Sequence, residues 1–403
     1  MTLAAPGALR SGRALRSGRA LRSGRWQAEP GFGVYVHIPF CLHRCHYCDF
    51  NTYESRGELH SSYVEALVAS IERSPLEVLR ATSVFFGGGT PTLLSTPQLA
   101  EILNAVRRRF GLEADAELTI EANPETVSEA TFEDLLEAGF NRFSLGVQSL
   151  VPHVLTGLGR THSGERALAA VAEARAAGAT DVNADLIYGS VWESEDDWRH
   201  SLEGVIDAGV EHVSAYALTV EEGTPLVTLV TTGRVPDVDP DVQAERHRVA
   251  CSMLAAAGFE RYEVSNWSRP GRASSHNVLY WSAGDYAAFG AGAHGHLAGT
   301  RWWNLRLPRD FIAAVESGAE PRSGSETLSP PERAGEALVL GLRLVSGVEL
   351  TAFGARFGDG PVAGRGAEID TLEALGLLER VDGWMRLTER GTLVANEVSC
   401  CLL

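Results

Sequence analysis

The sequence predicts an α/β protein in which short strands and amphipathic helices alternate along most of the chain. After Trp26, runs of β-branched and apolar residues alternate with stretches of helical period. One helix separates each pair of consecutive strands, a spacing that builds parallel sheet through right-handed crossovers. The chain has 403 residues, of which 44% are apolar and 22% charged. This is the composition of a globular protein with room for one large and one smaller domain.

The expected strands cover residues 34–38, 83–86, 117–121, 142–147, 181–187 and 212–218. The expected helices between them cover about 59–74, 96–110, 128–138, 164–177 and 195–208, followed by a helix at 240–257 and a strand near 261–264. Six such units fit either a doubly wound sheet or most of a barrel, and spacing alone does not choose between them. In both architectures the ligand site lies at the carboxyl ends of the strands.

The last third of the chain changes character. Residues 266–310 are rich in Trp, Tyr, His and Gly, so we expect more than a simple linker there. From about Glu332, three short helical patterns precede two strands joined by a turn at Asp382 and Gly383, which is typical of a winged helix. Because acidic residues match or exceed arginine in this part, we expect it to pack or to act as a lid rather than to bind DNA. The expected division is a core at 29–265, a connecting segment at 266–325 and a winged-helix-like α+β domain at 326–403.

The amino-terminal segment contains the hexapeptide ALRSGR three times in tandem over residues 8–25, with no acidic residue. Such a basic segment can be an organelle transit peptide or an arm that binds nucleic acid. Its exact repetition instead favours a disordered tail or a misplaced start codon. We therefore expect residues 1–28 to form a disordered, Arg-rich arm outside the fold.

The charge and the hydropathy pattern exclude several classes of protein. The formal net charge of −17 disfavours nucleic acid and anionic lipid as partners. No apolar run approaches the roughly 18 to 20 residues that cross a bilayer, and no apolar stretch near the start resembles a secretory signal. We expect a cytoplasmic protein with no membrane span and no specific nucleic-acid partner.

Three cysteines follow the first expected strand with the spacing C-x3-C-x2-C: Cys41, Cys45 and Cys48. In a reducing cytoplasm such a group is more often a metal site than a pair of disulfides. Zinc usually takes four protein ligands, and the fourth would be His37, His43 or His46. A 4Fe-4S cluster normally takes one thiolate per iron, so three thiolates leave one iron open. The position directly after a strand favours the cluster, because cofactors bind at that end of the sheet.

The other three cysteines are not expected to take part. Cys251 lies among apolar residues of the expected helix at 240–257, where a buried thiol acts as a small hydrophobic group. Cys400 and Cys401 are adjacent and nearly terminal.

Further candidate ligand-binding residues follow the later strands. In FFGGGTPT, at 85–92, the glycines permit positive φ, bring backbone close to a ligand and offer free N–H groups to an anion. Polar side chains also end three successive strands. Burying such a side chain without a partner is unfavourable, so we expect these three to face a ligand: Glu121, Gln148 and Asp185.

The cysteine spacing, with Tyr47 before the last cysteine, and the glycine motif resemble the radical S-adenosylmethionine (SAM) superfamily. That resemblance implies a partial (β/α)6 barrel of the TIM type, and a 4Fe-4S cluster whose open iron holds the amino and carboxylate groups of SAM. Arg160 is implied as the partner of the SAM carboxylate, since a guanidinium pairs with a carboxylate through two bonds. The SAM-binding residues implied are Tyr35, Gly88, Gly89, Thr90, Glu121, Gln148, Arg160 and Asp185.

From Val34 to about Trp303 the chain resembles the oxygen-independent coproporphyrinogen III oxidase group. The motifs are HIPFC, YCDF, GGGTPT, EANPE, GVQS, DLIYG, HNVLYW and GAGAHG, in that order. The true oxidases carry a further cysteine two residues after the third, whereas Asp49 and Phe50 follow Cys48 here. This departure, together with HNVLYW at 276–281, resembles the heme chaperone branch of the group, called HemW.

The same resemblance implies that HNxxYW binds heme, with His276 as the axial ligand and Tyr280 and Trp281 packed on the macrocycle. From the residues alone, the segment also suits an aromatic corner whose histidine is hydrogen-bonded to backbone. His294 and His296 are further possible ligands or simple loop residues.

The expected function is that of a heme chaperone, which binds a 4Fe-4S cluster, SAM and heme and passes heme to an acceptor protein. A flavodoxin or ferredoxin is the kind of electron donor expected, and no catalytic residue is assigned. One alternative is an oxygen-independent coproporphyrinogen III oxidase, against which the missing cysteine at position 50 argues. The other is a zinc-stabilised nucleic-acid-binding protein, against which the negative charge argues.

Overall fold

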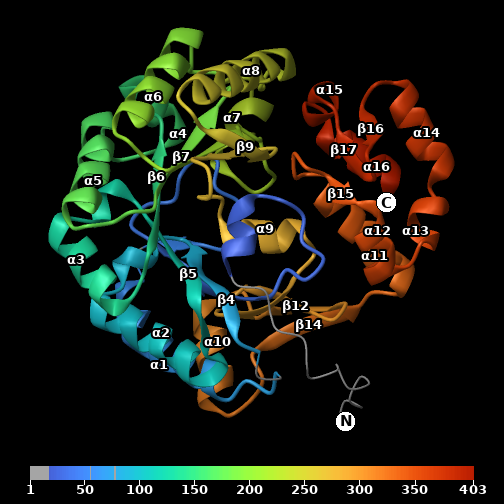
Figure 1. Ribbon diagram of the computed structural model, residues 1–403. Helices are drawn as coiled ribbons and strands as arrows, with labels where there is room; N and C mark the ends of the chain where they lie inside the picture. The colour runs from blue at the N-terminus through green and yellow to red at the C-terminus, as the bar shows by residue number, and fades with distance from the viewer. Residues whose placement is uncertain (1–17, 55, 77–78) are drawn as a thin grey trace.

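The computed structural model describes residues 18–54, 56–76 and 79–403, and its main unit is a partly closed barrel of parallel strands (Figure 1). Six strands lie side by side in their order along the chain, as expected from the sequence. They are β1 (Phe32–Ile38), β4 (Ala81–Gly88), β5 (Leu112–Ala122), β6 (Arg142–Gln148), β7 (Val182–Tyr188) and β8 (His212–Ala217). The α/β class and the strand–helix units are therefore confirmed.

Helices cover the outside of these strands (Figure 1). They are α1 (His60–Glu72), α2 (Thr96–Phe110), α3 (Glu129–Ala138), α4 (Pro152–Leu158), α5 (Gly164–Ala176), α6 (Glu195–Asp207), α7 (Pro225–Thr231) and α8 (Pro240–Ala256). Local chemistry sets their ends: Ser128 begins α3 by accepting a hydrogen bond from the Thr131 N–H, and Gly139 ends it at φ +103°. Within the described ranges, no helix is both long and apolar enough to span a membrane.

The sheet continues beyond the six strands on both sides. In the described part of the chain it has twelve strands, because β11 pairs in parallel with β1 and β10 pairs antiparallel with β8. The added elements are β9 (Glu260–Glu263), β10 (Asn266–Ser268), β11 (Asp285–Phe289), β12 (His294–Leu297), β13 (Thr300–Asn304), α10 (Pro308–Glu316) and β14 (Arg322–Thr327). The segment 266–325 thus contributes β10 to β13 and the start of β14 to the main sheet, while the domain boundaries themselves stay a prediction.

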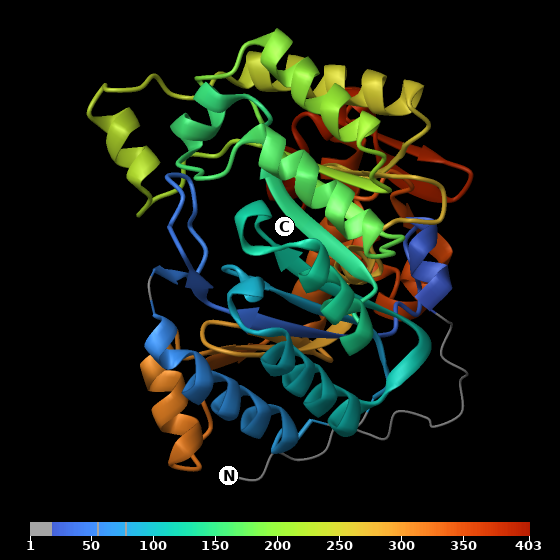
Figure 2. The same cartoon turned by 90° about the vertical axis from the view of Figure 1, so that its left-hand side faces the viewer.

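The amino ends of the strands are closed by two short helices, α9 (Ser275–Trp281) and η1 (Gly18–Ser23). Glu117 on β5 fixes the start of α9. Its carboxylate accepts hydrogen bonds from the backbone N–H groups of Ser275, at 2.8 Å, and His276, at 3.1 Å. These are N–H groups that a helix start leaves without partners of its own. In Figure 2 the blue helix η1 lies at one end of the strands, and the blue loop that follows β1 lies at the other.

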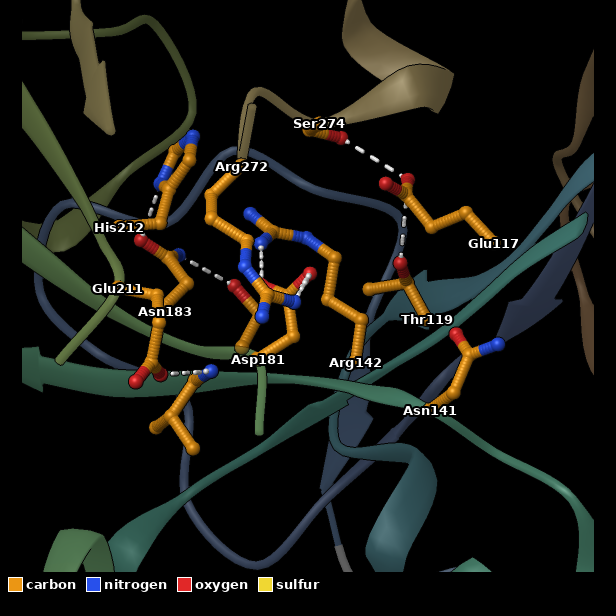
Figure 3. Close-up of polar contacts among 12 residues, drawn as sticks. Glu117, Thr119, Asn141, Arg142, Asp181, Asn183, Glu211, His212, Arg272 and Ser274 are labelled. Atoms are coloured by element: carbon orange, nitrogen blue, oxygen red, sulfur yellow. Dashed lines mark hydrogen bonds and ion pairs between the residues drawn. The ribbon is translucent and has the colours of Figure 1, made fainter. Parts of the chain in front are cut away.

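A buried ion pair lies at the same closed end (Figure 3). Arg142, at the start of β6, and Asp181, just before β7, are 3% and 1% exposed and are joined by a 2.6 Å contact. Arg22 of η1 donates to the other oxygen of Asp181, also at 2.6 Å. Arg272 lies 3.8 Å from the same oxygen, so three guanidinium groups share one carboxylate, which compensates its burial.

The expectation of a disordered arm over residues 1–28 is wrong for the part that the structure describes. Residues 1–17 lie outside the described residues. Leu21 and Trp26 are buried, and the Trp26 ring lies 6.2 Å from that of Phe353 in the last domain. Arginine-rich composition suggests a solvated tail, but these two apolar side chains fill a gap between the barrel and the last domain.

The carboxyl-terminal part is a small helical domain with a three-stranded sheet, at the right of Figure 1. Its expected hairpin is present, with Asp382 at φ +51° and Gly383 at φ +82°, the conformation of a tight primed turn. Its elements are α11 (Pro330–Gly341), β15 (Val348–Glu349), α12 (Leu350–Phe357), α13 (Gly360–Ala363), α14 (Gly366–Ala374), β16 (Leu378–Val381), β17 (Trp384–Leu387), α15 (Glu389–Thr392) and α16 (Ala395–Leu402).

Candidate cofactor site

A cavity of about 370 Å³ opens at the carboxyl ends of the barrel strands. Its walls bring together residues from the loops after β1, β4, β5, β6 and β7. The sequence-predicted residues among them are Cys41, Cys45, Cys48, Gly88, Gly89, Thr90, Glu121, Gln148, Arg160 and Asp185. Of the proposed SAM-binding residues, Tyr35 alone does not line the cavity. Its hydroxyl is hydrogen-bonded to His37 Nδ1 at 3.0 Å, below the cavity floor.

Hydrogen-bond donors surround the three half-buried cysteine sulfur atoms. Arg160 Nη1 lies 3.3 Å from Cys45 Sγ, and the Thr90 hydroxyl lies 3.8 Å from Cys41 Sγ. The backbone N–H of Phe50 faces Cys48. Burial raises the pKa of the Cys41 thiol to about 11, with the Thr90 hydroxyl acting in the opposite direction. Donors to sulfur suit thiolate ligands of iron. Iron binding would displace the thiol protons of the three cysteines.

The three histidines considered as a fourth zinc ligand have other partners. Both ring nitrogens of His37 are hydrogen-bonded, to Tyr35 and to the Asn51 carbonyl, and burial lowers the pKa of His37 to about 4. His46 Nδ1 bonds the Gly157 carbonyl at 3.0 Å. His43 lies 3.2 Å from Glu54. Among the described residues, no three Cys, His, Asp or Glu side chains meet closely enough to hold a single metal ion.

The glycine run after β4 packs against the cysteine loop. A Cβ on Gly89 would lie 2.5 Å from the Phe40 carbonyl oxygen, so no larger residue fits there. The expectation of free N–H groups is wrong. The N–H of Gly88 bonds Glu121, that of Gly89 bonds the Ile38 carbonyl, and that of Thr90 bonds the Phe40 carbonyl. The run therefore holds two loops together beside the cavity.

Two carboxyl groups, Glu121 on β5 and Asp185 on β7, line the cavity on either side of β6. Burial and the nearby Asp185 raise the pKa of Glu121 to about 8, while its bond from Gly88 acts the other way. Burial also raises the pKa of Asp185, which accepts from Ser144 at 2.9 Å and Asn183 at 2.8 Å. Carboxylates held out of water in this way favour a cationic ligand.

Arg160 is a cation that lines the same cavity, and it is held by several partners. Its Nη2 donates to Asn123 at 2.6 Å and to the Gly146 carbonyl at 2.9 Å. Gly146 makes this approach possible, because a Cβ there would lie 2.9 Å from the Asn123 oxygen. Gln148 turns into the cavity at the end of β6 with φ +64°, a conformation uncommon outside glycine.

Sequence reasoning missed several residues of the cavity. Asn123 follows Glu121 in the same EANP motif, so its position after β5 was a usable signal. Ser144 and Gly146 lie within β6; Gly146 opens the GVQS motif, which was a usable signal, whereas no motif includes Ser144. Tyr216, 42% exposed, reaches the cavity from β8.

The residues of the HNxxYW motif divide between two environments. Tyr280 and Trp281, with His294 and His296, line a second cavity of about 420 Å³ between the sheet edge and α11. His276 does not line it. It is 1% exposed, and its ring nitrogens are hydrogen-bonded to the Ser83 hydroxyl and the Tyr280 hydroxyl, each at 2.8 Å. Burial lowers the pKa of His276 to about 3.

Comparison with known proteins places the chain in a family. The family profile of the radical SAM superfamily matches residues 35–204, and that of the HemN C-terminal domain matches residues 328–394. The heme chaperone HemW of Mycobacterium tuberculosis (strain H37Rv) is 43% identical over 380 residues, which cover 92% of this chain and 95% of the relative. HemW of Bacillus subtilis is 33% identical, with coverage of 91% and 97%.

Among solved structures, the fold is similar to that of the coproporphyrinogen III oxidase HemN of Escherichia coli. The TM-score is 0.80, with 21% identity and coverage of 95% of this chain and 92% of that one. The likeness confirms the radical SAM barrel and, at this identity, concerns the fold alone. The matches to HemW proteins are 33% to 43% identical and cover more than nine tenths of the chain. The chain therefore belongs to the HemW family of the radical SAM superfamily.

Proposed function

We propose that this chain is a heme chaperone, which binds a 4Fe-4S cluster, SAM and heme and passes heme to an acceptor protein. The observation that carries the proposal is the likeness over nearly the whole chain to proteins named heme chaperone HemW. Two separate cavities support it. One is lined by the three cysteines, and the other lies beside the HNxxYW motif.

The first cavity suits the two cofactors that membership of the radical SAM superfamily implies. Cys41, Cys45 and Cys48 would hold the cluster, which supplies a redox-active iron with an open position. SAM carries a sulfonium and an amino group, and these cations would pair with Glu121 and Asp185 and favour the charged forms of the two carboxyl groups. The SAM carboxylate would pair with Arg160, which lines the same cavity. Gly88, Gly89, Thr90 and Gln148 support the same assignment because they line the cavity, whereas Tyr35 does not.

The contribution of Arg160 is testable by calorimetry with SAM on the cluster-loaded protein. Arg160→Ala removes a charge-assisted hydrogen bond that contributes about 1.5 to 3 kcal/mol, so we expect SAM to bind about 10- to 150-fold more weakly. Arg166→Ala is the matched control, because Arg166 lies outside the cavity on α5 and pairs with Glu173. Unchanged SAM affinity in Arg160→Ala would show that Arg160 is structural only.

The oxidase alternative predicts a different reaction. At the position where the oxidases have a further cysteine, this chain has Phe50. This side chain lines the first cavity and is 61% exposed. We expect no protoporphyrinogen after anaerobic incubation with coproporphyrinogen III, SAM and a strong reductant, followed by chromatography. A genuine coproporphyrinogen oxidase under the same conditions is the positive control. Product formed over many turnovers by this chain would overturn the chaperone assignment.

We further propose a cytoplasmic location and a flavodoxin or ferredoxin as electron donor. The described cysteines are all free thiols, as is usual for a reducing compartment. A small redox protein would suit as the electron donor of a cluster held by Cys41, Cys45 and Cys48.

A further inference from the structure

Three histidines are candidate heme ligands: His276, His294 and His296. The contacts of His276 make it poorly suited to bind the heme iron. Both of its ring nitrogens have partners inside the protein, Ser83 and Tyr280. Its ring also stacks on Phe85, with centroids 5.3 Å apart, and a Cβ on Gly33 would lie 3.2 Å from its Cε1. To bind iron, His276 would have to give up a buried hydrogen bond in a space already filled by side chains.

The second cavity offers an open site one turn further along the same helix. One wall is the end of α9 with Tyr280 and Trp281, and another is α11 with Leu340. Its floor is the face of β11 to β13 that carries Tyr286, His294 and His296. The cavity of about 420 Å³ is of the size that binds ligands, and aromatic walls suit a flat macrocycle.

His296 has the surroundings of a metal-binding histidine. Its side chain is 16% exposed, its Nδ1 lies 3.4 Å from Asp285 Oδ1, and its ring also has a backbone hydrogen bond to Gly284. Histidines that bind metal commonly pair one ring nitrogen with a carboxylate, which orients the ring and makes the other nitrogen a stronger ligand. His294 stands on the same face of β12, but it is exposed and its ring is stacked on Trp303 at 6.0 Å.

The cavity also contains donors that match the two carboxylates of heme. Arg333 of α11 has no carboxylate partner among the described residues. The Trp281 indole N–H is buried and makes no hydrogen bond within the protein. A propionate would pair with the guanidinium or satisfy the indole N–H. Arg301, in contrast, is already paired with Glu336 at 2.9 Å and with Glu326.

We infer that the cavity between β11–β13 and α11 is the heme-binding site, with His296 as the iron ligand. This inference rests on the proposed function, because it names where the cargo of the chaperone binds. His276 is then a positioning residue. Its hydrogen bond to the Tyr280 hydroxyl fixes the tyrosine whose ring meets that of Tyr286 at a 4.6 Å centroid distance, at the cavity wall.

The experiment is a titration of the cluster-loaded protein with ferric heme, followed by the Soret band. His296→Gly is expected to shift the band and to weaken heme binding by at least about 10- to 100-fold, the effect known for lost support of a metal site. Added imidazole should restore the wild-type band, which a merely structural role would not allow. Asp285→Asn should weaken binding about 10- to 100-fold without changing the ligand type.

Two variants serve as controls. His294→Ala, whose side chain lies on the cavity floor, and His276→Ala should each keep the histidine-ligated band even if the affinity for heme falls. The absorption of the iron–sulfur cluster should be the same in all variants, which shows that the barrel is folded. If His296→Gly kept the wild-type affinity for heme and the wild-type Soret band, the inference would be overturned. Imidazole rescue of His276→Ala or His294→Ala instead would also overturn it. In both cases the chain would still bind heme. A wild-type chain that binds no heme would overturn the proposed function itself.

Discussion

Cys41→Ala, Cys45→Ala and Cys48→Ala are each expected to reduce the iron content of the anaerobically purified protein from about four atoms per chain to nearly none. The three thiols are the only cysteines that line the first cavity in the described part of the chain. With one removed, two thiolates remain for four irons, too few to hold the cluster. Iron and sulfide analysis, with the visible absorption spectrum, measures the loss.

Cys251→Ala is the matched control for this prediction. Cys251 lies on α8, packs against the barrel core and has its sulfur 3.7 Å from His247 Nδ1. Its replacement should leave iron and sulfide unchanged. Stoichiometric zinc without sulfide in the wild-type protein, or a full cluster in any of the three alanine variants, would contradict the iron–sulfur assignment.

Asp181→Ala is expected to lower the free energy of unfolding by about 3 to 5 kcal/mol, because it leaves the buried guanidinium of Arg142 without its partner. The contact between them is 2.6 Å, and both side chains are nearly inaccessible to water. Urea unfolding followed by circular dichroism measures the change. Arg22→Ala should lower the free energy of unfolding by less, because Arg142 still pairs with Asp181 when the contact between Arg22 and Asp181 is lost.

Two further variants distinguish the stability effect of a buried ion pair from that of an exposed one. Glu245→Ala breaks an exposed pair with Arg248 on α8 and should cost less than about 1 kcal/mol. Replacing Arg142 with Met and Asp181 with Leu together should recover part of the lost stability, because the buried guanidinium is removed with its partner, while Arg22 and Arg272 are partly exposed to water. If Asp181→Ala proved no more damaging than Glu245→Ala, the buried pair would not contribute as described.

The barrel strands were predictable because strands buried on both faces form continuous apolar runs. Phe143 and Val147 of β6 are both buried, and the run around them marks the strand without any knowledge of its neighbours. The extension of the sheet was not predictable in this way. The five residues of β11 form a short mixed run, and they become a strand because β1, from the other end of the chain, pairs with them.

The residues of the first cavity were predictable where a motif placed them after a strand, as for Glu121 and Asp185. The contacts of His276 were not, because Ser83 lies on a distant strand and only the closed barrel brings the two together. The free N–H groups expected of the glycine run were wrong for the same reason. The N–H groups of Gly89 and Thr90 donate to the carbonyls of Ile38, at the end of β1, and of Phe40. The glycine motif does not predict that these residues lie beside it.

The tandem hexapeptide has a consequence for how the gene tolerates change. Leu21 and Arg22, which help to close the barrel, belong to the copy of ALRSGR next to Trp26, and the two upstream copies repeat the same letters. Trp26 follows only the last copy, so it fixes which copy meets the barrel. Slipped replication that adds or removes one upstream copy leaves the run ALRSGRW intact. The residues that close the barrel would therefore keep their sequence whatever the number of upstream copies.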